Sequence, residues 1–258
     1  MQIGGVTAVV TGAAKGIGAA LVAELKTRGA AHVAAFDISD AVNSCGADSS
    51  YTLDVSDAAE MRAAIGAVEA SAGPIGLFCS NAGIIGALDL SFENAAGASV
   101  ADWQRAWDVN VMAHVHAAAV LVPLMRARGG GHFLQTASAA GLLSQIGSAP
   151  YATTKHAAIG FAENLAISHR DDGIRVSVLC PQGVDTDMIR GAEDHPAAMD
   201  GVLSAEAVAK AALDGVEAER FLILPHPKVE GYLTAKVAHY ERWIGGMAKL
   251  QRGYKPAS

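Results

Sequence analysis

A short apolar segment, a glycine-rich turn and an amphipathic helix follow one another at the start of the chain. Residues 6–10 (VTAVV) are apolar and mostly β-branched, which is typical of a strand buried on both faces. Residues 11–18 (TGAAKGIG) have glycines at positions 12, 16 and 18, and residues 19–30 have the apolar spacing of a helix. The three pieces predict the first half of a β-α-β unit. The free N–H groups and positive dipole end of such a helix favour an anionic pyrophosphate.

Short apolar runs alternate with helical segments along the rest of the chain. Because such alternation predicts a parallel sheet between two helical layers, we expect an α/β fold. It would be a single-domain Rossmann-type doubly wound sheet of about seven mostly parallel strands. The domain covers residues 1–258, with a substrate loop at about 187–203 and a C-terminal helical tail at about 228–258. Expected strands start near residues 6, 32, 51, 75, 132, 174 and 221, and expected helices include 61–70, 101–128, 156–170, 204–216 and 228–250.

Composition argues against several classes of partner. The net charge is −7, and no run of Lys or Arg exceeds two residues, so we expect no nucleic acid and no membrane anchor among the partners. Cys45, Cys79 and Cys180 are widely spaced, which predicts neither a metal site nor a disulfide framework. No charged leader or apolar run of about 20 residues is apparent. We therefore expect a cytoplasmic protein.

Tyr151 and Lys155 are the strongest candidates for chemistry. Four residues apart on a helix, their side chains lie on one face. A nearby ammonium lowers the pKa of a phenol, and a fall from about 10 to about 7 needs roughly 4 kcal/mol. One lysine together with a cationic cofactor ring could supply that in a partly desolvated cleft. Ser138 ends the strand-like run 132–138, at the edge of the sheet where ligands bind. The pair taken alone also fits a half-buried packing tyrosine and a solvated lysine.

Asp37 ends the second expected strand, about 20 residues after the glycine turn. A carboxylate there accepts hydrogen bonds from a ribose diol. It would repel the 2′-phosphate of NADP by about 4 kcal/mol at about 4 Å and an effective dielectric near 20. This favours NAD, although Lys15 in the glycine turn could pair with that phosphate. The alternative for Asp37 is a helix cap or a turn residue.

Several motifs together resemble the short-chain dehydrogenase/reductase family over nearly the whole chain. Residues 11–18 match the cofactor turn of this family, and SNAG at 80–83 matches its Asn-Asn-Ala-Gly motif. Residues 181–186 (PQGVDT) match its Pro-Gly-x-Val-x-Thr motif, except that Gln182 replaces a glycine. The catalytic tetrad of the family matches, in order, Asn110, Ser138, Tyr151 and Lys155.

The resemblance implies a role for each of these residues. Tyr151 would be the acid/base group, and Lys155 would lower its pKa and bind the nicotinamide ribose. Ser138 would bind the substrate oxygen, and Asn110 would hold a water of a proton relay. No metal is implied, and the expected assembly is a homotetramer or a dimer. The cofactor-binding residues would be Gly12, Lys15, Gly16, Ile17, Gly18, Asp37, Asp54, Val55, Asn81, Ala82, Gly83, Tyr151, Lys155, Pro181, Val184 and Thr186.

Some of these residues also have structural alternatives. The amide of Asn81 can bridge strands, Asp54 can hold a turn, and a buried Asn110 needs a polar partner whatever its role. In the tail, Tyr232, Tyr240 and Trp243 could dock on a partner subunit.

We expect an NAD-dependent oxidoreductase that interconverts a secondary alcohol and a ketone. The alternatives are an NADP(H)-preferring carbonyl reductase, a lyase or isomerase that uses bound NAD, and a non-catalytic dinucleotide-binding protein. The candidate pocket residues are mostly apolar, which favours an apolar, aromatic or alicyclic substrate. They are Ile84, Ile85, Leu142, Leu143, Gln145, Ile146, Gln182 and Met188.

Overall fold

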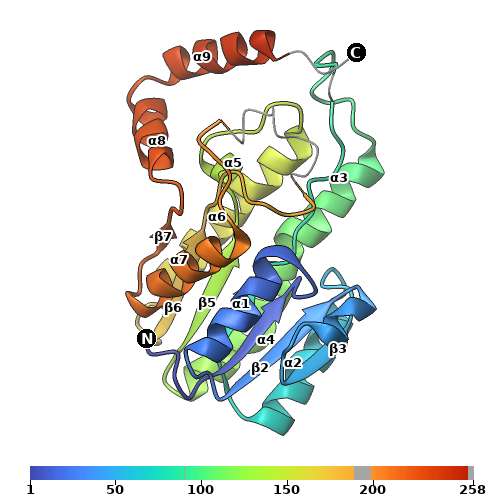
Figure 1. The fold of residues 1–258 in the computed structure, drawn as a ribbon, viewed down its shortest axis with the longest axis vertical. Helices are drawn as coiled ribbons and strands as arrows, with labels where there is room; N and C mark the ends of the chain where they lie inside the picture. Colours follow the sequence, from blue (N-terminus) through green and yellow to red (C-terminus); the bar gives the residue numbers. More distant parts are fainter. Residues whose placement is uncertain (90, 189–198, 255–258) are drawn as a thin grey trace.

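The computed structural model describes residues 1–89, 91–188 and 199–254, and its centre is a parallel sheet between two layers of helices (Figure 1). The strand order is β3-β2-β1-β4-β5-β6-β7, and every pair is parallel. The doubly wound α/β fold predicted from the sequence is therefore confirmed. The strands are β1 (Thr7–Thr11), β2 (His32–Asp37), β3 (Ser49–Thr52), β4 (Ile75–Ser80), β5 (Gly131–Thr136), β6 (Ile174–Leu179) and β7 (Leu222–Ile223).

The helices bury one apolar stripe each against a face of the sheet. One face packs against α1 (Gly16–Thr27) and α7 (Ala205–Glu217). The opposite face packs against α2 (Ala58–Ala72), α4 (Ala113–Ala127) and α6 (Ala149–His169). The remaining elements are η1 (Asp40–Ser44), α3 (Val100–Trp107), η2 (Asp108–Met112), α5 (Ala139–Leu142), α8 (Lys228–Ala238) and α9 (Tyr240–Gly253).

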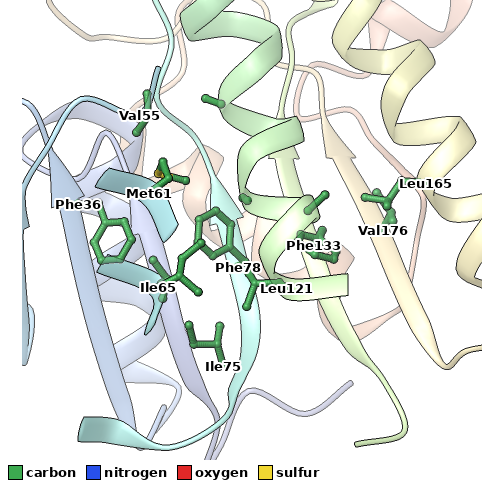
Figure 2. Close-up of a cluster of buried hydrophobic side chains, with 14 of the residues drawn as sticks. Phe36, Val55, Met61, Ile65, Ile75, Phe78, Leu121, Phe133, Leu165 and Val176 are labelled. Atoms are coloured by element: carbon green, nitrogen blue, oxygen red, sulfur yellow. The ribbon is translucent and has the colours of Figure 1, made fainter. Parts of the chain in front are cut away.

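Three phenylalanines on different strands form the centre of one core layer (Figure 2). Phe78 on β4 lies 6.5 Å from Phe36 on β2 and 6.5 Å from Phe133 on β5, measured between ring centres. All three are almost completely buried, and their strand neighbours Leu77 and Leu134 belong to the core on the other face. Side chains alternate between the faces of a strand, so each strand supplies both cores.

One strand lies earlier in the chain than the sequence predicts, and two of the predicted helices are each divided into shorter elements. β3 ends at Thr52, where it pairs with Asp37, the last residue of β2. The run from 53 to 55 has strand-like residues but no partner strand beside it, so it forms a loop. A π-helical turn, η2, interrupts the helix expected at 101–128. His239 separates α8 from α9 within the expected tail.

The consecutive helices α3, η2 and α4 form a segment from Val100 to Ala127 that is apolar and long enough to cross a membrane. The expectation that no such run exists was therefore wrong. In the structure this segment packs beside α2 and α6, and half of its most apolar window is buried inside the protein. Burial against the sheet explains the apolar composition.

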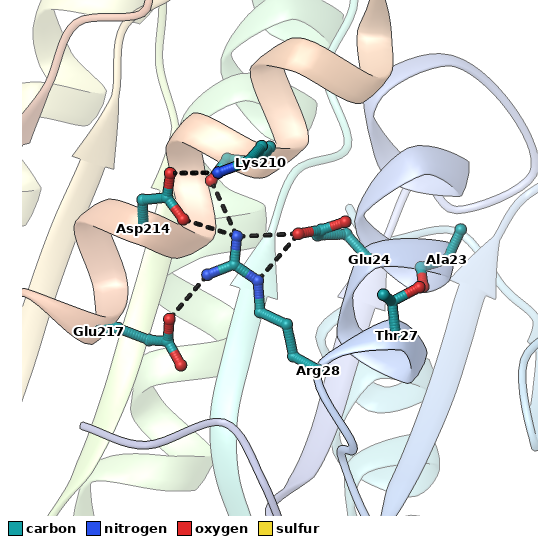
Figure 3. Close-up of polar contacts among 7 residues, drawn as sticks. All are labelled: Ala23, Glu24, Thr27, Arg28, Lys210, Asp214 and Glu217. Atoms are coloured by element: carbon teal, nitrogen blue, oxygen red, sulfur yellow. Dashed lines mark hydrogen bonds and ion pairs between the residues drawn. The ribbon is translucent and has the colours of Figure 1, made fainter.

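Arg28 links the two helices that cover one face of the sheet (Figure 3). Its guanidinium donates to Glu24 on α1 and contacts Asp214 at 2.7 Å and Glu217 at 2.8 Å on α7. It also donates to the carbonyl of Lys210 at 3.3 Å. The Arg28 side chain is only 14% exposed, so water screens this cluster less than an ordinary surface pair.

Replacing Arg28 with Met is expected to lower the free energy of unfolding by about 1–2 kcal/mol, because three carboxylates lose their shared cation. The matched control is Lys26→Met, which breaks one exposed pair with Asp48 and should cost less than about 0.5 kcal/mol. Urea unfolding of both variants measures the difference. Equal losses in the two variants would contradict a special role for Arg28.

Candidate active site

A cavity of about 700 Å³ opens at the carboxyl ends of the strands. In an open parallel sheet this is the edge where ligands bind, because loops from neighbouring strands diverge there. Most of the residues expected at the site from the sequence line this one cavity. They are Gly12, Lys15, Gly16, Ile17, Asp37, Asp54, Val55, Asn81, Ala82, Gly83, Ile84, Ile85, Ser138, Tyr151, Lys155, Pro181, Gln182, Val184, Thr186 and Met188.

The turn between β1 and α1 requires glycine at three of its positions. Gly12 has φ +65°, and a Cβ there would lie 2.8 Å from the Cα of Ala82. Gly16 has φ +56°, and its Cβ would lie 3.1 Å from Cγ2 of Thr186. Gly18 does not line the cavity; it packs below the turn, where a Cβ would collide with the Gly12 carbonyl. The absence of side chains leaves a cradle that a pyrophosphate can enter.

Asp37 is held at the end of β2 by two backbone N–H groups. Ala14 donates to Oδ2 and Ser39 donates to Oδ1, both at 2.9 Å. The first bond ties the carboxylate to the glycine turn, and the side chain lines the cavity. Lys15 instead pairs with Asp187 at 2.8 Å, and its side chain is 73% exposed. The fixed charge at this end of the cavity is therefore the carboxylate.

Asp54 forms an ion pair with a residue that the sequence analysis missed. Arg105 on α3 lines the cavity and contacts Oδ2 of Asp54 at 3.0 Å, while Ser56 donates to Oδ1. Burial alone would raise the pKa of Asp54, but these hydrogen bonds from Ser56 and Arg105 outweigh it and lower the pKa. Nothing in the sequence spacing of Arg105 indicated this contact, which depends on how α3 packs.

Asn81 joins three strand ends. Its Nδ2 donates to the carbonyl of Thr11 at 3.1 Å, and its Oδ1 accepts from the hydroxyl of Thr136 at 3.1 Å. Asn81 thus bridges the ends of β1, β4 and β5, as the structural alternative predicted. It also lines the cavity, so the bridging amide is part of the wall.

Ser138 and Tyr151 meet at the wall of the cavity. Ser138 caps α5, where its hydroxyl accepts from the N–H of Ala140 at 3.1 Å. Tyr151 lies in the first turn of α6 and is 8% exposed. Burial raises the pKa of the Tyr151 phenol, and a hydrogen bond from Ser138 opposes this effect. The net direction is upward, and the lowering expected from the sequence invokes a cationic cofactor ring in addition to Lys155.

Lys155 is buried beside the ring of Tyr151. Its Nζ lies 5.7 Å from the centre of the Tyr151 ring and donates to the carbonyl of Thr136 at 3.1 Å. Lys155 is 3% exposed, and burial lowers its pKa to about 8. Desolvation acts on both members of the pair and disfavours the charged form of each. Burial is therefore the largest influence on the pKa of the Tyr151 phenol.

Asn110 lies behind the cavity wall rather than on its surface. It occupies the π-turn η2, and its amide exchanges two hydrogen bonds, both of 2.9 Å, with the backbone of Ile84. Its Nδ2 also donates to Thr154 at 3.1 Å. A Cβ on Gly83 would lie 3.3 Å from Oδ1 of Asn110 and 3.2 Å from Nζ of Lys155. The two polar atoms therefore converge on the same side of Gly83.

A buried histidine lies beneath this group. His114 on α4 has its Nδ1 2.7 Å from the hydroxyl of Ser80, the first residue of the SNAG motif. Burial, together with the nearby charge of Lys155, lowers the pKa of His114 to about 3. A neutral imidazole thus supports the strand end, a contact that residue spacing alone does not reveal.

Four of the apolar or polar residues expected in the substrate pocket are not in the lining. Leu142 packs against the core cluster that contains Val229. Lys236 of α8 donates to the carbonyls of Leu142 and Leu143, at 2.7 and 2.9 Å. The other three are Leu143, Gln145 and Ile146. Of the expected substrate loop at 187–203, residues 189–198 lie outside the described part of the chain.

Part of the expected C-terminal tail packs against the rest of the chain. Tyr232 donates to Asp200 at 3.1 Å, and Trp243 packs against the cluster that contains Val229. Tyr240 is 51% exposed. At the end of α9, the ring of Tyr254 lies 5.9 Å from that of Phe92, so α8 and α9 arch over the same end of the molecule as the cavity (Figure 1).

Comparisons with known proteins agree with this geometry. A family model described as short chain dehydrogenase matches residues 6–197. A 1-deoxy-11-beta-hydroxypentalenate dehydrogenase from Streptomyces avermitilis is 35% identical over 84% of this chain and 83% of its own. Borneol dehydrogenase from Lavandula x intermedia is 33% identical over 82% of this chain and 83% of its own.

Solved structures give the same result. A short chain dehydrogenase/reductase from Burkholderia phymatum, in complex with NAD, has a TM-score of 0.82 and 28% identity over 93% of this chain and 96% of its own. A putative short-chain dehydrogenase from Novosphingobium aromaticivorans has a TM-score of 0.75, with 28% identity over 99% and 90% of the two chains. The chain belongs to the short-chain dehydrogenase/reductase family of oxidoreductases, whose members bind NAD or NADP.

Proposed function

We propose that this protein interconverts a secondary alcohol and a ketone with NAD, and that Tyr151 is the acid/base group. The observation that carries the proposal is the meeting of two hydroxyls, those of Ser138 and Tyr151, beside the buried ammonium of Lys155 in one cavity. The relatives named as dehydrogenases of hydroxypentalenate and of borneol support an alcohol as substrate.

The residues present fit a dinucleotide. The cradle at Gly12 and Gly16 would hold the pyrophosphate, Asp37 would accept from the adenosine ribose, and Asp54 and Val55 would border the adenine. Bound NAD supplies the two-electron redox chemistry of the reaction.

Tyr151 takes the proton of the alcohol, or returns it to the ketone, while Ser138 holds the substrate oxygen. Before the substrate binds, the Ser138 hydroxyl donates to the Tyr151 oxygen, which favours the phenolate. When Ser138 holds the substrate oxygen, this single donor turns to the substrate. Burial works against the phenolate, so the positive charge of Lys155 is needed nearby. Lys155 remains close to Tyr151 because the Thr136 carbonyl holds its Nζ. Asn110 and Lys155 converge beside Gly83, a suitable place for the water that relays the proton.

Asp37 supports NAD over NADP. Its carboxylate is fixed by Ala14 and Ser39 and cannot swing away from a 2′-phosphate, whereas the exposed Lys15 is already paired with Asp187. The apolar wall of Ile84, Ile85 and Met188 favours a substrate with little charge.

We also propose that the protein is a cytoplasmic homo-oligomer, a tetramer or a dimer. In support, Cys79 and Cys180 are buried free thiols, which suits a reducing compartment. No residue of α9 is buried, and Tyr240 and Ile244 are 51% and 57% exposed, so this helix offers apolar surface to another subunit.

Tyr151→Phe is expected to lower kcat by roughly 10²–10⁴-fold, because the variant has no proton to exchange. The assay is NADH formation with a panel of secondary alcohols. Tyr51→Phe is the control, since Tyr51 packs against Phe36 outside the cavity. Substrate turnover without net NADH would indicate a lyase or isomerase, and NAD binding without any turnover would indicate a non-catalytic binder.

Asp37→Asn is expected to tighten NADP binding by about tenfold or more, because it removes a like charge facing the 2′-phosphate. The measurement is the Kd for NAD and for NADP by titration calorimetry. Asp40→Asn removes an exposed carboxylate three residues further on and should leave the ratio of the two constants nearly unchanged. A wild-type protein that binds NADP as tightly as NAD would contradict the proposed preference.

Lys155→Met is expected to abolish turnover but to raise the free energy of unfolding by about 1–2 kcal/mol at pH 7. The fall of its pKa from 10.5 to about 8 corresponds to about 3 kcal/mol of destabilisation, which loss of the bond to Thr136 partly offsets. The folded protein loses this proton near pH 8 and the unfolded chain near 10.5, so wild-type stability rises with pH between these values and the gain in the variant disappears.

Lys236→Met is the matched control for this effect. Lys236 is also buried, but it donates to the carbonyls of Leu142 and Leu143. Its removal leaves both carbonyls without a donor and should lower the free energy of unfolding by about 2 kcal/mol. Denaturant unfolding at several pH values compares the two variants. A loss of stability in Lys155→Met at pH 7 would contradict the proposed destabilisation by the buried Lys155 charge.

A further inference from the structure

We propose that Gln182 binds a second hydroxyl of the substrate, so that the preferred substrates are secondary alcohols or ketones that carry another hydroxyl group. This inference rests on the proposed function. It arises from the residue that replaces the glycine of the family motif, in a segment that a hydrogen bond from Ala139 to Pro181 ties to the helix capped by Ser138.

The backbone around Gln182 is held firmly from both sides. The N–H of Gln182 donates to Nδ1 of His226 at 3.1 Å, and Nε2 of His226 donates to the carbonyl of Gly183 at 3.0 Å. On the other side, the carbonyl of Pro181 accepts from the N–H of Ala139 at 2.8 Å. His226 is 3% exposed. These contacts fix where the Gln182 side chain starts, directly beside the helix that Ser138 caps.

A buried carboxylate fixes the orientation of the Gln182 amide. Nε2 of Gln182 donates to Oδ2 of Asp200 at 3.2 Å. Oδ1 of Asp200 receives Lys228 at 2.9 Å and Tyr232 at 3.1 Å, and the Asp200 side chain is only 5% exposed. An ionised carboxylate accepts hydrogen bonds and donates none. The NH₂ group of Gln182 must therefore face Asp200, and its carbonyl oxygen faces the other way.

That carbonyl oxygen is buried and has no hydrogen-bond partner. The other buried side-chain atoms without a partner in the described part of the chain belong to His114, His132 and Gln135, and none of these residues lines the cavity. Gln182 does line it. A buried acceptor left unpaired is unfavourable, and a ligand that brings a donor removes this cost.

The chemistry of the surroundings defines the donor. The cavity wall also includes Ile85 and Met188, whose side chains offer no hydrogen-bonding group to a second hydroxyl. A hydroxyl can donate to the Gln182 oxygen, whereas a methyl ether cannot. An ionised carboxylate has no proton to donate and would approach the charge of Asp200. The site therefore selects a hydroxylated substrate over its ether and its acid.

The test uses three simple diols, cyclohexane-1,2-, -1,3- and -1,4-diol, each compared with its monomethyl ether. With the wild-type enzyme and NAD, at least one diol should have a kcat/KM about tenfold or more above that of its ether. In Gln182→Met, which keeps the length of the side chain but removes its amide, this ratio should fall to within about twofold of unity.

Gln104→Met is the matched control. Gln104 on α3 also donates its amide to an aspartate, Asp108, but it is exposed and lies outside the cavity lining. This variant should keep the wild-type ratio. If Gln182→Met fails to fold, Gln182→Gly restores the residue typical of the family and should lose the selectivity in the same way.

Binding measurements separate this inference from the proposed function. The affinities of each diol and its ether for the Tyr151→Phe protein, saturated with NAD, are measured by calorimetry and need no turnover. Tighter binding of a diol, abolished by adding Gln182→Met, supports the proposal even if no NADH is formed. Equal affinities, no binding of either probe, or a Gln182→Met effect on the Kd for NAD alone would overturn it. The last outcome would assign the Gln182 oxygen to the carboxamide of the dinucleotide.

Discussion

The turn after β1 and the segment after β4 approach each other so closely that no side chain fits between them at Gly12, where a Cβ would lie 2.8 Å from the Cα of Ala82. This contact brings the glycine turn beside the SNAG segment, and Asn81 then connects both to β5 through Thr11 and Thr136. The cavity floor is therefore a set of strand ends locked to one another. These strand ends position the side chains that line the cavity, including Asp37 and Lys155.

Burial in this site disfavours the charged forms of both Tyr151 and Lys155. Desolvation raises the pKa of Tyr151 and lowers that of Lys155, so neither side chain is poised for chemistry by burial alone. Ser138 and the Thr136 carbonyl compensate in part, each by a hydrogen bond to one member of the pair. Such compensation is typical of sites that are completed by a ligand, because stability and function place different demands on a buried charge.

The sequence was sufficient for the fold and for most of the cavity lining, since alternating apolar runs and glycine spacing are local properties of the chain. Residues outside any motif could not be predicted: Arg105, Asp200 and His226 reach the site only because α3 and the segments before α7 and α8 fold back over it. The spacing of Tyr151 and Lys155 indicated their proximity but not how strongly burial raises the pKa of the phenol. Leu142 was misplaced for a similar reason: whether an apolar residue faces a pocket or a core depends on α8, which is distant in sequence.

Lys236 on α8 makes the segment next to Ser138 depend on a helix that is synthesised late. Its ammonium holds the carbonyls of Leu142 and Leu143, close behind the helix that Ser138 caps, across 94 and 93 positions of sequence. A ribosome completes the sheet strands before it has made this lysine. The segment next to Ser138 therefore receives these hydrogen-bond donors only when α8, which is made after all seven strands, has docked.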